Sequence, residues 1–124
     1  MKKTVLLIED NPDNREIVET VLRKNSYKVI SACDGEEALK RLKKGNYDLV
    51  LLDLSLPKIS GWDLIKMIRE DERIKDLPVI ALTAHAMQGD KEKAIEAGCN
   101  DYISKPCKPY EIVEKVKRWI NEEK

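Results

Sequence analysis

The chain has 124 residues, a length that suits one domain. Hydrophobic residues make up 42% of it, which is too large a share for a disordered chain. Lys plus Arg and Asp plus Glu number 23 each, so the formal charge is zero. This balance gives no electrostatic reason to expect a nucleic-acid or membrane-surface partner.

The three cysteines and the N-terminus bear on the compartment. Cys33, Cys99 and Cys107 are odd in number and lack metal-like spacing, which favours reduced thiols over a disulfide framework. The start of the chain is basic, but its apolar run covers only Val5 to Ile8. This run is too short for a signal peptide, and no window approaches transmembrane length. We therefore expect a cytoplasmic protein.

Five short apolar runs alternate with five amphipathic stretches along the chain. The runs are Thr4 to Ile8, Lys28 to Ala32, Leu49 to Leu52, Val79 to Leu82 and Tyr102 to Ser104. Most of them are continuous rather than alternating, which is typical of strands buried on both faces. Five successive βα units predict a parallel sheet with helices on both faces, a three-layer α/β sandwich.

The stretches between the runs carry helix start and stop signals. The expected starts are Asn11, Asp34, Ser60 and Pro109, and the expected stops are Gly45 and Gly98. In the first helix, Ile17 is expected to face inward together with Val18, Val21 and Leu22. Near the C-terminus, Tyr110 and Trp119 are expected to pack in or beside the core.

Polar side chains follow four of the five runs. Ligands of open α/β sheets bind beyond the carboxyl ends of the strands, so the last residues of each run matter most. The residues at these ends are Glu9 and Asp10, Asp53, Thr83, and Ser104 with Lys105. Crowded carboxylates repel one another and need a cation, and oxygen-only ligands suit a hard ion such as Mg²⁺. A carboxylate beside Mg²⁺ and a lysine is a reasonable nucleophile toward phosphorus.

Four segments together resemble the response-regulator receiver family of two-component signalling. These are IEDN at 8–11, DLSLP at 53–57 with Gly61, ALTA at 81–84, and YISKP at 102–106. The resemblance covers nearly the whole chain. It implies a flavodoxin-like (βα)5 sandwich with strand order 2-1-3-4-5 and a single receiver domain over residues 1–124, without an output domain.

The resemblance also implies a phosphorylation and metal site. Asp53 is the expected phosphoacceptor. Asp10, Asp53 and the backbone carbonyl of Ser55 are the expected ligands of Mg²⁺, with Mn²⁺ as a substitute. Glu9 is expected to act through a metal-bound water.

Further roles follow from the same resemblance. Thr83 and Lys105 are the expected catalytic hydroxyl and lysine, and Thr83 with Tyr102 forms the expected switch. The bond between Lys105 and Pro106 is expected to be cis. Ser55 and His85, the only histidine of the chain, are expected to tune the phosphoryl lifetime.

The implied function is a phosphoryl-accepting switch that does not act as a metabolic enzyme. The donor would be a histidine kinase or a histidine phosphotransfer protein. Output to an unknown target would pass through roughly Met87 to Ala97, Asn100 to Ser104 and Pro109 to Ile120, in a monomer or a phosphorylation-dependent dimer. Neither nucleic acid nor a membrane is expected as a partner.

Four alternatives remain open from the sequence. The chain could be a receiver excised from a hybrid histidine kinase, or a degenerate receiver that is never phosphorylated. It could also be a Mg²⁺-dependent phosphatase-like enzyme, although it has no cap to enclose a substrate. A flavodoxin-like cofactor binder would need a phosphate-binding loop, whereas residues 9–13 are acidic and lack glycine.

Overall fold

The computed structural model describes residues 2–56, 58–83, 90–105 and 107–120, in which five strands alternate with five helices. They are β1 (Thr4–Ile8), α1 (Pro12–Lys24), β2 (Lys28–Ala32), α2 (Gly35–Lys44), β3 (Leu49–Asp53), α3 (Gly61–Glu70), β4 (Val79–Thr83), α4 (Asp90–Ala97), β5 (Asp101–Ser104) and α5 (Pro109–Trp119). The expected strands are confirmed, and β3 and β4 each extend one residue further. Asp53 and Thr83 are therefore held within the sheet.

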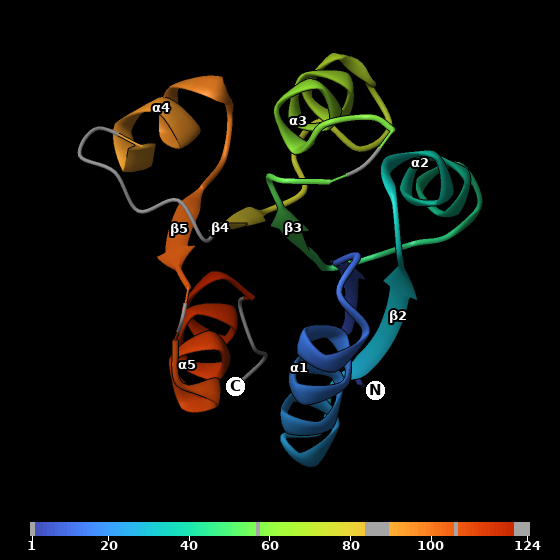
Figure 1. Cartoon of the computed structure of the whole chain (residues 1–124). Helices are drawn as coiled ribbons and strands as arrows, with labels where there is room; N and C mark the ends of the chain where they lie inside the picture. Colours follow the sequence, from blue (N-terminus) through green and yellow to red (C-terminus); the bar gives the residue numbers. More distant parts are fainter. Residues whose placement is uncertain (1, 57, 84–89, 106, 121–124) are drawn as a thin grey trace.

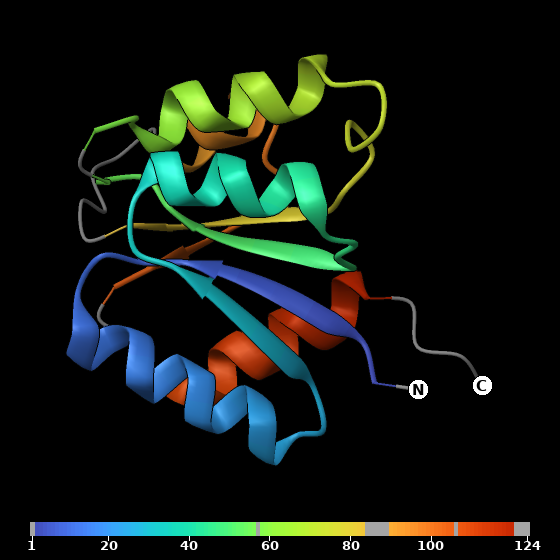
Figure 2. The same ribbon diagram turned by 90° about the vertical axis from the view of Figure 1, so that its right-hand side faces the viewer.

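The five strands form one parallel sheet in the order β2-β1-β3-β4-β5, which confirms the flavodoxin-like topology. Helices α1 and α5 cover one face of the sheet, and α2, α3 and α4 cover the other (Figures 1 and 2). No helix among the described residues has the length and apolar character needed to cross a membrane.

Successive strand residues point into two different cores. In β1, Leu6 and Ile8 pack beneath α2, α3 and α4, whereas Val5 and Leu7 pack against α1 and α5. All four side chains are fully buried. The apolar runs are continuous because both faces of the sheet are covered.

The predicted helix caps are confirmed in detail. The side chains of Asn11, Asp34 and Ser60 each accept a hydrogen bond from the backbone N–H three residues further on. The carboxylate of Glu37 accepts a hydrogen bond from the N–H of Cys33 at 2.8 Å. Cys33 is the residue before the capping residue Asp34. Gly98 follows α4 with φ +123°, a conformation that favours glycine.

Two side chains do not pack as the sequence predicts. Ile17 is 52% exposed and Tyr110 is 56% exposed, so both predictions of inward packing are wrong. Trp119 is half-buried against the α1/α5 core, as expected. The helical period places Ile17 beside the apolar stripe of α1. It does not predict how much of that stripe the rest of the protein buries.

Candidate functional site

The polar strand ends converge at one edge of the sheet. Glu9 follows β1, Asp53 ends β3, Thr83 ends β4 and Lys105 follows β5. The sheet register pairs Asp53 with Leu82, the residue before Thr83. Glu9, Asp53 and Thr83 are only 1%, 5% and 4% exposed. Three buried polar side chains at one sheet edge form a functional site more readily than a structural one.

Lys105 links the two buried carboxylates. Its Nζ lies 2.6 Å from Oε1 of Glu9 and 3.2 Å from Oδ2 of Asp53. Burial alone would lower the pKa of Lys105, but the hydrogen bond to Glu9 and the negative charge of Asp53 outweigh burial and raise it. The side chain is therefore an ammonium group that neutralises part of the carboxylate charge.

Backbone groups fix the orientation of both carboxylates. The N–H of Asn11 donates to Oε2 of Glu9 at 3.1 Å, and the N–H of Ser55 donates to Oδ1 of Asp53 at 2.8 Å. The guanidinium of Arg15 donates to the carbonyl of Glu9 at 3.0 Å. Burial raises the pKa of the Glu9 carboxyl, and the hydrogen bond from Lys105 opposes that effect.

The acidic cluster fits a hard divalent cation. Carboxylate oxygens of Glu9, Asp10 and Asp53 all lie within 4.8 Å of one another. The first and third of these residues are buried and Asp10 is exposed, so the cluster opens to solvent on one side. When ionised, three carboxylates and one lysine leave a net charge of −2, which matches Mg²⁺. Oxygen ligands together with access for water suit the coordination of this ion.

The other predicted site residues differ in burial. Thr83 is buried at the end of β4, and Ser55 is exposed. Tyr102 on β5 is half-buried and packs against the core beneath α2, α3 and α4. His85 and Pro106, and therefore the predicted cis bond after Lys105, lie outside the described residues.

The connection from β3 to α3 returns the chain closely past Asp53. The N–H of Gly61 donates to the carbonyl of Leu54 at 3.2 Å. A Cβ on Gly61 would lie 2.5 Å from Cα of Leu54 and 2.7 Å from the carbonyl oxygen of Asp53. Both neighbours are backbone atoms that cannot move aside, so this position requires glycine.

We predict that Gly61→Ala lowers the free energy of unfolding by about 1–3 kcal/mol, because the new methyl group displaces the backbone of Asp53. Urea denaturation followed by circular dichroism measures the loss. Gly45→Ala is the matched control, since a Cβ there would meet the ring and hydroxyl of Tyr47, a side chain that can move. Equal losses in the two variants would contradict the argument.

Sequence reasoning missed two contributors to this edge of the sheet. Arg15 was given no role from the sequence, yet its guanidinium donates to the backbone carbonyl of Glu9. Lys93 of α4 lines a pocket together with Thr83 and Ser55. An exposed lysine on an amphipathic helix carries no sequence signal, because such residues usually face solvent.

Comparison with known proteins decides the family. A family model described as the response regulator receiver domain matches residues 5–117. The chain belongs to the response-regulator receiver family. The polar-differentiation response regulator DivK of Brucella ovis is 36% identical over 122 residues, covering 98% of this chain and 99% of DivK.

Solved structures agree with this assignment. The receiver domain of sensor histidine kinase PA1611 from Pseudomonas aeruginosa PAO1 is 39% identical, with a TM-score of 0.89 over 98% of this chain and 100% of that one. That structure holds a magnesium ion in its active-site cleft. Chemotaxis response regulator CheY4 of Vibrio cholerae is 26% identical, with a TM-score of 0.90 over 95% and 98% of the two chains.

Family membership confirms the resemblance found in the sequence. The chain is a receiver domain of two-component signalling, with a phosphoacceptor role and with partners of the histidine kinase or phosphotransfer class. The family acts in signalling rather than in metabolic turnover. The cluster of Glu9, Asp10 and Asp53 suits a metal ion.

Proposed function

We propose that the chain accepts a phosphoryl group on Asp53 from the phosphohistidine of a kinase or phosphotransfer protein. The observation that carries this proposal is the buried Asp53 carboxylate, held 3.2 Å from the Lys105 ammonium and inside the acidic cluster. If Asp53 were only a turn or helix-capping residue, it would not need to be buried in contact with an ammonium group. One sheet with helices on both faces supports residues 1–124 acting as a single receiver domain.

The transfer is a substitution at phosphorus. A carboxylate oxygen of Asp53 attacks the phosphorus atom and forms a P–O bond while the P–N bond to the histidine breaks. The electron pair returns to the imidazole nitrogen, which takes up a proton. Lys105 neutralises the negative charge that gathers around Asp53, and the N–H of Ser55 keeps the carboxylate oriented.

The metal ligands in this proposal are Asp10, Asp53 and the carbonyl of Ser55, with Glu9 acting through a bound water. Mg²⁺ would neutralise phosphoryl oxygens during the reaction, and Mn²⁺ would substitute for it. Support comes from the oxygen-only donor set, from the net charge of −2 that the three ionised carboxylates leave together with Lys105, and from the magnesium ion in the related PA1611 receiver.

The signal would leave through a change at Thr83 and Tyr102. These residues lie on adjacent strands, where Ala81 of β4 pairs with Tyr102 of β5. Movement of the Thr83 hydroxyl toward a phosphoryl group would shift packing beside β5 and bias the outer surface between two populations. Ser55 and His85 would set how fast water removes the group.

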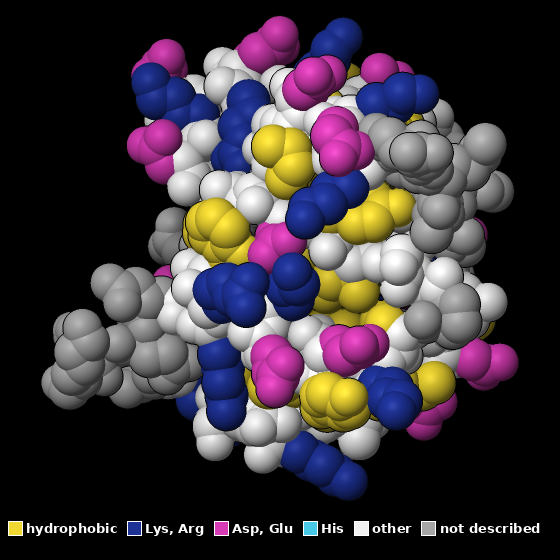
Figure 3. All heavy atoms as spheres, turned by 90° about the vertical axis from the view of Figure 1, so that its left-hand side faces the viewer, with side chains coloured by type: hydrophobic (Ala, Val, Ile, Leu, Met, Phe, Trp, Pro, Cys, Tyr) yellow, Lys and Arg dark blue, Asp and Glu magenta, His cyan; other side chains and the backbone are white. Residues whose placement is uncertain are grey.

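The output surface in this proposal is formed by α4, β5 and α5. Figure 3 shows charged side chains of both signs on this face, with hydrophobic side chains between them. A mixed surface of this kind suits a reversible protein partner, whether a downstream target or a second copy of the phosphorylated chain.

Intact mass spectrometry tests the proposal. After incubation with Mg²⁺ and either acetyl phosphate or phosphoramidate, the chain should gain one phosphoryl group. The gain should disappear in Asp53→Asn and after chelation of the metal, whereas the exposed control Asp76→Asn should behave like the parent chain. Continued release of phosphate from a small ester, without a stable gain in mass, would favour the phosphatase-like alternative instead.

A further inference from the structure

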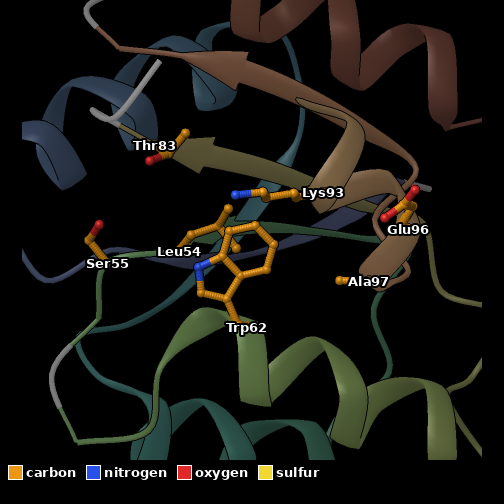
Figure 4. Close-up of a pocket in the computed structure, with 7 residues that line it drawn as sticks. All are labelled: Leu54, Ser55, Trp62, Thr83, Lys93, Glu96 and Ala97. Atoms are coloured by element: carbon orange, nitrogen blue, oxygen red, sulfur yellow. The ribbon is translucent and has the colours of Figure 1, made fainter. Parts of the chain in front are cut away.

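A pocket of about 630 Å³ lies between α3 and α4 and reaches the edge of the sheet. Its walls include Leu54, Ser55, Trp62, Thr83 and Lys93 (Figure 4). The size falls within the range of small-molecule sites, about 300–1,000 Å³. The carboxylates of Glu9, Asp10 and Asp53 do not line it, but Ser55 and Thr83 do, so the pocket adjoins the phosphorylation site and shares two residues with it.

Two lining residues connect the pocket to Asp53. Ser55 donates its N–H to the Asp53 carboxylate at 2.8 Å. Thr83 follows Leu82, the residue that pairs with Asp53 in the sheet. A molecule that presents a phosphoryl group to Asp53 can therefore place the rest of its structure in the pocket.

The residues that line the pocket determine which leaving group of a phosphoryl donor would fit there. Trp62 is half-buried and supplies a flat aromatic wall, and the apolar Leu54 lines the same pocket. Lys93 is exposed, and its amino end points toward the side of the pocket where Thr83 and Ser55 lie, while Glu96 lies at the opposite end (Figure 4). A planar aromatic group with negative charge near the phosphoryl end matches this arrangement.

We propose that this pocket is a subsite for the acyl group of an aromatic acyl phosphate that phosphorylates Asp53 directly. The inference rests on the proposed function of Asp53. The Asp53 carboxylate attacks phosphorus, a new P–O bond forms, and the bond from phosphorus to the acyl oxygen breaks. The electron pair leaves with that oxygen as an aromatic carboxylate, and no proton or further reactant is required.

The two key side chains have separable roles. Lys93 would stabilise the negative charge that develops on the departing carboxylate, whatever the size of its acyl group. Trp62 would stack on the acyl group and act only when that group is aromatic. A donor whose leaving group is neither charged nor aromatic, such as phosphoramidate, should use neither side chain.

The experiment compares three donors, namely benzoyl phosphate, acetyl phosphate and phosphoramidate, by the rate of phosphoryl gain in intact mass. Lys93→Met should slow transfer from both acyl phosphates by about threefold to tenfold and leave phosphoramidate within about twofold. Trp62→Leu should slow benzoyl phosphate alone, by about threefold to tenfold. Lys91→Met changes an exposed lysine of the same helix outside the pocket and should alter none of the rates.

The donor pattern separates failure of this inference from failure of the proposed function. Equal slowing with all three donors, or no change in either pocket variant, would overturn the acyl subsite while Asp53 still accepts phosphoryl groups. If the parent chain gains no phosphoryl group from any of the donors, the proposed function itself fails.

Discussion

Replacing Lys105 with methionine should slow phosphoryl transfer to Asp53 by about a hundredfold to a thousandfold, the usual cost of losing one charge-stabilising donor. The Nζ atom lies 3.2 Å from Asp53, and nothing else among the described residues brings a cation into salt-bridge contact with that carboxylate. Methionine preserves much of the length of the side chain, so the change isolates the charge. Rapid-quench sampling and intact mass give the rate.

The same substitution should strengthen magnesium binding. Lys105 contacts Glu9 at 2.6 Å as well as Asp53, so its ammonium repels any cation in the cluster of Glu9, Asp10 and Asp53. Removing it should tighten Mg²⁺ binding by about threefold to tenfold, read by fluorescence of Trp62 during a Mg²⁺ titration.

Tighter metal binding combined with slower transfer cannot result from a misfolded variant, which would lose both. Lys108→Met removes an exposed lysine three residues further on and is the matched control. Transfer in Lys105→Met at a rate within about threefold of the parent chain would contradict a role for this ammonium.

The convergence of the site could be predicted because parallel strands end at one edge of their sheet. Glu9, Asp53 and Thr83 were placed together on that ground. The register sets Asp53 opposite Leu82, the residue before Thr83, and the carboxylates of Glu9 and Asp53 lie within 4.8 Å of each other. The bridge from Lys105 to Glu9 could not be predicted, because the sequence suggests only that a lysine stands near the carboxylates. Which oxygen it reaches depends on side-chain positions 96 residues apart.

Exposure was harder to predict than secondary structure. Helix α1 has a regular apolar stripe, yet Ile17 lies at its uncovered margin. Asp101 differs in the opposite direction: the sequence begins the last apolar run at Tyr102 and leaves Asp101 outside it, in the polar pair Asn100-Asp101, a pattern typical of loops. In the structure it begins β5 and is 7% exposed, because its partners come from α5, which the chain reaches only later.

Asp101→Ala should lower the free energy of unfolding by about 3 kcal/mol, since it removes a buried acceptor with three donors. The carboxylate accepts hydrogen bonds from Trp119 Nε1 at 2.7 Å, from the N–H of Tyr102 at 2.8 Å and from Lys115 Nζ at 3.0 Å. Two of these donors, Trp119 and Lys115, belong to α5, so the carboxylate links α5 to the edge strand β5 by hydrogen bonds. Urea denaturation followed by circular dichroism measures the loss.

Asp101→Asn removes the negative charge of the side chain but keeps its shape, so it measures the contribution of the charge to stability. The amide has one acceptor oxygen, and its NH₂ group would face a donor, so about 1.5–3 kcal/mol should be lost at neutral pH. Glu114→Gln, an exposed change on α5, is the control and should cost less than about 0.5 kcal/mol. Equal losses in these two variants would contradict the role of Asp101.

The pH dependence of the Asp101→Asn loss identifies its cause. Burial alone would raise the pKa of Asp101, but the hydrogen bonds from Trp119, Tyr102 and Lys115 outweigh burial and lower it from the ordinary 3.8. A lowered pKa in the folded chain stabilises the fold above the unfolded pKa, and this contribution disappears as the pH falls through the folded value. The difference between the parent chain and Asp101→Asn should therefore be constant from neutral pH down to about 4 and shrink below it. A difference that stayed constant to pH 2 would mean that lost shape, and not lost charge, destabilises the variant.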